Sequence, residues 1–268
     1  MKTIVITGST SGIGKALTQY FAEGNKVFAG YRNAKYVKDL ELLGVIPFYI
    51  DMTNTSSIYQ ATDFIKSQTD KIDTLINVAG CVVAGVVENL EVDRIREQFE
   101  VNTFSHIDFS QKLLDLLDGG KIINISSMAS FGIFPFVAPY CASKRALDIL
   151  FNSFANETKR NIKVVSVKPG VIATPLWEKS LDLNKDSINN CVGFEKEMNF
   201  MVKNARKNGV QGLDVNKVVE LISKIDSMDN PKSSYTVGFD AKVAEMVSHL
   251  PQGLINSIIK FKLKSRAK

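Results

Sequence analysis

Short apolar runs and helical patterns alternate along nearly the whole chain, and this order constrains the fold more than any other feature of the sequence. The runs have the β-branched and aromatic composition of buried strands. They cover residues 3–6, 26–29, 45–50, 73–78, 121–125 and 163–167. Helical patterns lie between them, the clearest at residues 13–23 and 92–117. Because parallel strands are joined by right-handed helical crossovers, this order predicts an α/β fold, a doubly wound parallel sheet with helices on both faces.

The composition narrows the class of protein. A chain of 268 residues, 45% of them hydrophobic, can bury a large core, and we expect one domain spanning residues 1–268. The longest apolar run, residues 78–87, is much shorter than a bilayer span. The strand at residues 3–6 leaves no room for a signal peptide. Three cysteines and two histidines without ligand spacing predict reduced thiols, a cytoplasmic protein and no metal site.

The net charge of +5 originates at the C-terminus. Five basic residues and no acidic residue lie between Lys260 and Lys268, and the rest of the chain carries 28 of each sign. A neutral body argues against nucleic acid as a partner. The basic C-terminal extension, residues 241–268, is a solvated fringe, a subunit contact, a lid on the substrate pocket or a weak membrane-surface contact. Its apolar residues at helical spacing are Leu254, Ile255, Ile258, Ile259 and Phe261.

A glycine-rich turn follows the first strand and opens the first helix. It reads Thr-Gly-Ser-Thr-Ser-Gly-Ile-Gly over residues 7–14. Glycines permit a tight turn and let backbone N–H groups approach a pyrophosphate at the N-terminus of a helix. The position of the turn, between a strand and a helix, favours a dinucleotide site over an ordinary loop and predicts a Rossmann fold.

The end of the second strand indicates which dinucleotide binds. An NAD site places Asp or Glu there, about 20 residues after the glycines. This chain has no acidic residue between Glu23 and Asp39, and Arg32 occupies that stretch. A guanidinium group can bind a 2′-phosphate through charge-assisted hydrogen bonds, which predicts NADP(H); a surface arginine is the alternative. The residue before the second glycine is Ser11 rather than a base, so we expect the preference to depend mainly on Arg32.

Tyr140 and Lys144 lie four residues apart, a spacing that places both side chains on one face of a helix. A nearby ammonium group lowers the pKa of a tyrosine from about 10 by roughly 1–3 units. The phenol would then serve as a general acid or base near neutral pH. A surface tyrosine beside a solvated lysine is the alternative.

In order and spacing, these motifs resemble the short-chain dehydrogenase/reductase family in its Tyr-x-x-x-Lys form, over about residues 1–240. The amino-acid sequence at residues 140–144 and 167–176 is similar to that of the hydroxysteroid/retinol dehydrogenase-like branch. The resemblance implies four catalytic residues: Asn102, Ser127, Tyr140 and Lys144. Val78 departs from the family's Asn-Asn-Ala-Gly motif at residues 77–80. The cofactor-binding residues expected from the motifs and the resemblance are Gly8, Ser9, Ser11, Gly12, Ile13, Gly14, Tyr31, Arg32, Asp51, Met52, Asn77, Ala79, Gly80, Tyr140, Lys144, Pro169, Gly170, Ile172 and Thr174.

The reaction that the resemblance implies is hydride transfer between a nicotinamide and a carbonyl or alcohol carbon. Tyr140 would donate the proton in reduction or remove it in oxidation. Lys144 would lower the pKa of Tyr140 and hold the nicotinamide ribose. Ser127 would bind the substrate oxygen, and Asn102 would hold a water that replaces the proton.

The expected substrate is hydrophobic, either a secondary alcohol and its ketone or a primary alcohol and its aldehyde. Apolar residues follow the fifth and sixth strands, where they either pack the core or line a substrate pocket. They are Met128, Phe131, Ile133, Phe134, Phe136, Val137, Ile172, Leu176 and Trp177. Residues 171–212 resemble the family's substrate-covering segment.

Two other functions compete with an alcohol dehydrogenase or carbonyl reductase. A catalytically idle NADP(H)-binding sensor or scaffold could use the same fold, but it would not need the four catalytic residues. A C=C reductase is the other alternative. Its family relatives usually space the tyrosine and lysine more widely, so the four-residue interval between Tyr140 and Lys144 argues against it. The resemblance also implies a homodimer or homotetramer.

Overall fold

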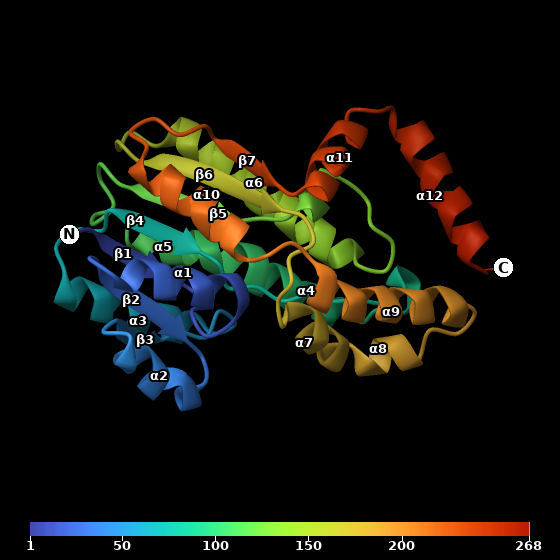
Figure 1. Ribbon diagram of the computed structural model, residues 1–268, viewed down its shortest axis with the longest axis horizontal. Helices are drawn as coiled ribbons and strands as arrows, with labels where there is room; N and C mark the ends of the chain where they lie inside the picture. The colour runs from blue at the N-terminus through green and yellow to red at the C-terminus, as the bar shows by residue number, and fades with distance from the viewer. Residues whose placement is uncertain (268) are drawn as a thin grey trace.

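Seven parallel strands form one sheet in the order β3-β2-β1-β4-β5-β6-β7 (Figure 1). The computed structural model describes residues 1–267 of the chain, and side chains up to residue 263. The strands are β1 (Thr3–Ile6), β2 (Lys26–Tyr31), β3 (Ile46–Tyr49), β4 (Thr74–Asn77), β5 (Lys121–Ile125), β6 (Lys163–Pro169) and β7 (Ser234–Val237). The strand order reverses direction at β1 and β4, as in a doubly wound sheet, so the predicted fold class is confirmed.

Helices cover both faces of the sheet. Helices α1 and α10 pack on one face, and α3, α5 and α6 on the other. Along β2 the side chains alternate between them, because Val27 and Ala29 face the first layer and Phe28 the second. The helices are α1 (Gly12–Ala22), α2 (Val37–Leu42), α3 (Thr55–Gln68), α4 (Val92–Phe99), α5 (Ser105–Lys112), α6 (Ala138–Glu157), α7 (Leu176–Leu183), α8 (Lys185–Asn189), α9 (Glu195–Gln211), α10 (Asn216–Ser227), α11 (Phe239–Val247) and α12 (Gln252–Ala267), with short 3₁₀ turns η1 (Ala34–Tyr36), η2 (Val87–Asn89) and η4 (Met128–Phe131).

The helix predicted over residues 92–117 is not uniform. A π-helical turn, η3 (Glu100–Phe104), separates α4 from α5, and α5 already ends at Lys112. The N–H of Ser105 bonds to the carbonyl of Glu100, five residues back, which widens the helix at this point. Hydrophobic periodicity does not reveal such a turn, because it changes the backbone and leaves the apolar pattern nearly intact.

The seventh strand, β7, was absent from the sequence prediction. It is four residues long, it pairs only with β6, and its sequence Ser-Tyr-Thr-Val lacks an apolar run. Short edge strands depend on their neighbour for stability, so local composition gives little warning of them.

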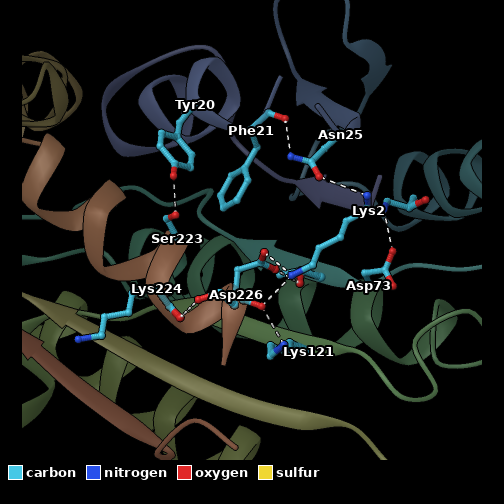
Figure 2. A network of polar contacts seen from close by, with 12 residues as sticks. Lys2, Tyr20, Phe21, Asn25, Asp73, Lys121, Ser223, Lys224 and Asp226 are labelled. Atoms are coloured by element: carbon cyan, nitrogen blue, oxygen red, sulfur yellow. Dashed lines mark hydrogen bonds and ion pairs between the residues drawn. The ribbon is translucent and has the colours of Figure 1, made fainter. Parts of the chain in front are cut away.

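A charged network closes the end of the sheet where β1 and β4 begin (Figure 2). The buried carboxylate of Asp226 on α10 accepts from Lys2 Nζ at 2.7 Å and from Thr74 Oγ1 at 2.6 Å. Lys121 Nζ donates to the main-chain carbonyl of the same residue at 3.0 Å. These bonds tie α10 to β4, to β5 and to the residue before β1, so we assign the network a structural role.

Helices α7, α8, α9, α11 and α12, which all follow β6 in the sequence, lie beyond the opposite end of the sheet (Figure 1). Residues 171–212 form α7, α8 and α9, and residues 241–268 hold most of α11 and α12, which packs against α9. The basic side chains of Lys264 and Arg266, and Lys268 as a whole, lie outside the described residues. Within the part of the chain that the structure describes, no helix has the length and apolar character needed to cross a membrane.

Candidate active site

The glycine-rich turn forms a cradle at the carboxyl end of β1. Gly8 and Gly12 have φ values of +68° and +52°, which side chains rarely tolerate. A Cβ atom built on Gly14 would lie 2.2 Å from the carbonyl oxygen of Gly8, so only glycine fits there. Helix α1 begins at Gly12 and has no acidic residue in its first turn, which leaves its N–H groups and positive end available to an anion. The turn therefore fits the pyrophosphate of a dinucleotide.

The loop after β4 forms the second wall of this cradle. Thr7 Oγ1 accepts from the N–H groups of Val78 at 2.9 Å and Ala79 at 3.1 Å. A Cβ on Gly8 would lie 3.0 Å from the Cα of Ala79. Asn77 is different, because its side chain is buried and donates to Asn124 Oδ1 at 2.8 Å. Its amide therefore braces β4 against β5.

The predicted adenosine residues lie at the ends of β2 and β3. Arg32 directly follows β2 and is exposed, and no carboxylate pairs with it among the described residues. The Tyr31 ring packs against the ring of Tyr49 with centroids 5.9 Å apart. Asp51 follows β3 and accepts from the N–H of Thr53 at 2.9 Å. Met52, by contrast, is buried in the core against α3.

Asn102 projects from the π turn η3 and fixes the loop after β4. Its Oδ1 accepts from the N–H of Cys81 at 3.0 Å, and its Nδ2 donates to the Cys81 carbonyl at 3.0 Å and to Ser143 Oγ at 3.2 Å. The amide thus joins three parts of the chain: η3, the loop after β4, and α6. The π turn that carries Asn102 thus forms part of the candidate site.

Ser127 contacts Tyr140, and Lys144 lies close to Gly80 together with Asn102. Ser127 follows β5 and hydrogen-bonds to the Tyr140 phenol, whereas Lys144 Nζ donates to the Ile125 carbonyl at 2.8 Å. A Cβ on Gly80 would lie 3.3 Å from Asn102 Oδ1 and 3.7 Å from Lys144 Nζ. Helix α6 thus brings Tyr140 to Ser127, and it brings Lys144 to the loop that Asn102 fixes.

The pKa values differ from the sequence prediction. Burial raises the pKa of Tyr140 to about 12, and the hydrogen bond from Ser127 offsets only part of this effect. Burial lowers the pKa of Lys144 to about 8, against the opposing charge of Asp148. The prediction that Lys144 lowers the pKa of Tyr140 is wrong for the free protein, because desolvation dominates and the Lys144 ammonium bonds to Ile125.

Three residues behind this group were not predicted. Asp148, one helical turn after Lys144, is buried, and among the described ion pairs it contacts only Lys168 Nζ of β6, at 3.2 Å. Lys168 also lies over the ring of Phe131, 4.6 Å from its centroid. His106 on α5 is buried, and its Nε2 bonds to the Ala79 carbonyl at 2.8 Å; burial lowers the pKa of this imidazole to about 3. Helical spacing alone could have suggested Asp148, because residues 140, 144 and 148 share one face.

The segment after β6 begins against the glycine cradle. A Cβ on Gly12 would lie 3.3 Å from the Cβ of Thr174. Pro169 ends β6, and Gly170 packs so closely on Asp240 that a Cβ there would lie 2.0 Å from its carboxylate. Ile172 is buried, and its carbonyl accepts from Trp177 Nε1 at 2.8 Å. The predicted nicotinamide residues thus stand next to the predicted pyrophosphate residues.

An apolar cluster lies beside these elements. Phe136, whose φ of +67° is positive, and Phe194 have ring centroids 6.2 Å apart. The ring of Phe136 joins the connection after β5 to the start of α9. The other members of the cluster are Val86, Ile188, Cys191, Met198 and Met201. This cluster shows that at least part of the predicted apolar wall is packed between the connection after β5 and residues 188–201.

Comparison with known proteins gives a family match. The family model described as "short chain dehydrogenase" matches residues 2–185. An NADPH-dependent 3-dehydrocapnine reductase from Ornithobacterium rhinotracheale is 32% identical, covering 67% of this chain and 69% of its own. A 3-ketodihydrosphingosine reductase from Bacteroides thetaiotaomicron is 29% identical over 94% of each chain. A solved short-chain dehydrogenase from Streptomyces avermitilis has a TM-score of 0.79 at 24% identity, covering all of this chain and 98% of its own.

Proposed function

Because the chain belongs to the short-chain dehydrogenase/reductase family, we propose that it interconverts a hydrophobic alcohol and its carbonyl compound with NADP(H). The observation that carries this proposal is a grouping of two pairs: Ser127 bonds to the Tyr140 phenol, and Asn102 and Lys144 both lie close to Gly80. This grouping lies next to a glycine cradle that fits a dinucleotide.

The bound nicotinamide supplies the hydride, and the residues of the chain handle the proton and the substrate oxygen. Tyr140 donates its phenolic proton to the oxygen of the carbonyl group during reduction. The Ser127 hydroxyl, already bonded to that phenol, holds the same oxygen. Lys144 contributes a positive charge one helical turn away, and Asn102 keeps the loop after β4 in place. The relay water expected at Asn102 remains a prediction.

The preference for NADP(H) rests on Arg32. This exposed guanidinium follows β2, and no acidic residue occupies the position that an NAD site would use. A 2′-phosphate would neutralise Arg32 through charge-assisted hydrogen bonds. A relative at 32% identity is named as NADPH-dependent, which supports the same choice.

The proposed substrate is an apolar ketone or alcohol. The relatives reduce 3-dehydrocapnine and 3-ketodihydrosphingosine, according to their names. Residues 171–212 would cover the substrate, because they start at the cradle and carry most of the apolar cluster around Phe136. A pocket closed by such side chains excludes water and favours hydrophobic substrates.

We also propose that this enzyme contacts further copies of itself and, weakly, an anionic membrane. Family resemblance supports a homodimer or homotetramer. Helix α12 exposes Leu254, Ile258 and Phe261, whose exposed fractions are 49%, 37% and 74%. With Lys260 and Lys262 nearby in sequence, this surface suits weak contact with an anionic membrane.

The test is a screen of NADPH oxidation against steroid, retinoid, quinone and long-chain keto substrates, with Tyr140→Phe as the matched variant. Wild type should turn over at least one substrate class. Tyr140→Phe should lose nearly all turnover but keep its affinity for NADPH, because it removes one hydroxyl and no cofactor phosphate contact. Unchanged turnover in Tyr140→Phe would show that the proton comes from another group. A wild type that binds NADPH and reduces nothing would favour the idle sensor instead.

A further inference from the structure

Lys179 on α7 reaches the start of α1, although the two elements are far apart in the sequence. Its Nζ donates to Ser11 Oγ at 3.0 Å. Ser11 is the residue before the first turn of α1, and its side chain makes no capping bond to that helix. The segment that follows β6 therefore places an ammonium group at the mouth of the glycine cradle.

This location is already positive without Lys179. The N-terminus of a helix carries about half of an elementary positive charge. The first turn of α1 holds no acidic residue to balance it. No described ion pair gives Lys179 a carboxylate partner. A cation beside the positive end of a helix is electrostatically unfavourable, and a bound anion would reverse the sign of that interaction.

The chain on both sides of the contact holds Lys179 in place. Thr174, five residues earlier, packs on Gly12 of the cradle. Asn184, five residues later, is buried and accepts from the N–H of Ala84 at 2.9 Å while donating to the Val82 carbonyl at 2.7 Å. Helix α7 therefore spans from the cradle to the loop after β4, and Lys179 lies between these two anchors.

The same turn adjoins the strand that leads to Arg32. The N–H of Ser9 donates to the Gly30 carbonyl at 2.9 Å, which joins the cradle to β2. The cradle thus has basic groups from two directions, Arg32 from the end of β2 and Lys179 from α7. The sequence indicates only Arg32, because Ser11 occupies the position at which the glycine turn could carry a basic residue of its own.

We propose that Lys179 binds a phosphate group of the dinucleotide at the N-terminus of α1, leaving Ser11 to do so. This inference rests on the proposed function, since it assigns a further cofactor-binding residue to the same site. Because Lys179 belongs to the segment that would cover the substrate, the bond to phosphate also couples cofactor binding to the position of α7. Affinity for the cofactor then depends on two bases rather than on Arg32 alone.

The test is direct titration of NADPH and NADH by fluorescence, without substrate, in wild type, Lys179→Met and Lys185→Met. Lys185 is the matched control, since it is an exposed lysine of the neighbouring α8 whose partner is Asp182. Lys179→Met should raise the Kd for NADPH about tenfold, equivalent to about 1.4 kcal/mol. Lys185→Met should leave both Kd values unchanged. Lys179→Arg should restore most of the affinity.

The two cofactors distinguish the two phosphate sources. If Lys179→Met loses equal affinity for NADPH and NADH, Lys179 binds the pyrophosphate. If it loses affinity for NADPH alone, Lys179 binds the 2′-phosphate. Either result supports the proposal. Unchanged Kd values for both cofactors would overturn it. A wild type that binds neither cofactor would refute the proposed function and this inference together, whereas tight binding that ignores Lys179 refutes the inference alone. Melting temperatures without cofactor should agree among the variants, because Lys179 is exposed.

Discussion

The charge of Lys144 should depend on Asp148, and the substitution Asp148→Asn tests this dependence. Lys144 is buried, and burial lowers its pKa to about 8 while Asp148 opposes that change. Three other titratable groups of the site are neutral near pH 7. Burial raises the pKa of Cys81 to about 11 and that of Tyr140 to about 12, and it lowers the pKa of His106 to about 3.

The size of the effect follows from the helical spacing. Residues four apart on a helix are roughly 6 Å from each other. At an effective dielectric constant of about 20, opposite charges at that distance interact by about 3 kcal/mol, or roughly two pKa units. Asp148→Asn should therefore lower the pKa of Lys144 from about 8 to about 6. The ammonium form predominates only below this pKa. The variant should therefore lose the charge of Lys144 at a pH about two units lower than the wild type does.

The assay is the pH dependence of kcat/KM, which reports ionisations of the free enzyme. In the wild type the alkaline decline should begin near pH 8, and in Asp148→Asn near pH 6. At pH 7.5 the protonated fraction of Lys144 would fall roughly 25-fold, with activity following it. An alkaline decline that stays near pH 8 in Asp148→Asn would refute the reasoning.

A stability measurement separates this electrostatic role from a packing role. Removing the carboxylate leaves Lys168 buried without its partner, and breaking a buried ion pair costs about 3–5 kcal/mol. The double variant Asp148→Asn/Lys168→Met removes both charges, so it should recover much of the lost stability. It should not recover the alkaline limb, because Lys144 still lacks Asp148. The double variant also carries the test if the single variant does not fold.

Three further predictions address other parts of the chain. Arg32→Ala should lower kcat/KM for NADPH roughly a hundredfold more than for NADH, since two charge-assisted hydrogen bonds contribute about 1.5–3 kcal/mol each; equal losses would mean that Arg32 does not contact the 2′-phosphate. Gly14→Ala should abolish cofactor binding in a fluorescence titration, because its Cβ would lie 2.2 Å from a backbone oxygen, whereas Gly253→Ala, with nothing within 4 Å, should bind normally. Replacing Leu254, Ile258 and Phe261 with Ser should reduce sedimentation with anionic vesicles at low salt; if wild type also stays in the supernatant, the membrane contact is refuted.

The sequence predicted the parts of the fold that depend on local pattern. Six of the seven strands, the helix carrying Tyr140 and the glycine turn lie where the apolar runs and glycine spacing predicted them, with boundaries within a few residues. The parts that failed depend on contacts between distant segments. The edge strand β7 forms only against β6, and the π turn at residues 100–104 places Asn102 against Cys81 and Ser143.

For the site, spacing gave the residues but not their electrostatics. Proximity along a helix suggested that Lys144 acts on Tyr140, yet the lysine ammonium bonds to Ile125. Burial, which no local pattern predicts, disfavours the charged form of each group. It therefore raises the pKa of Tyr140 and lowers that of Lys144. Lys179 could not be foreseen at all, because its contact with Ser11 depends on how α7 crosses the cradle.

The raised pKa of Tyr140 bears on the direction of the proposed reaction. With a pKa of about 12, only about one phenol in 100,000 is ionised at pH 7 in the free protein. Proton donation to a carbonyl oxygen can start from this neutral phenol. Removal of a proton from an alcohol needs the phenolate, whose formation at pH 7 costs about 7 kcal/mol. Of the groups near the phenol, the Ser127 hydroxyl lowers its pKa only in part, while the charge of Lys144 is directed to Ile125. Burial therefore favours the neutral phenol in the free protein, and ionising Tyr140 for the proposed oxidation would need a cation near the phenol or an alkaline solution.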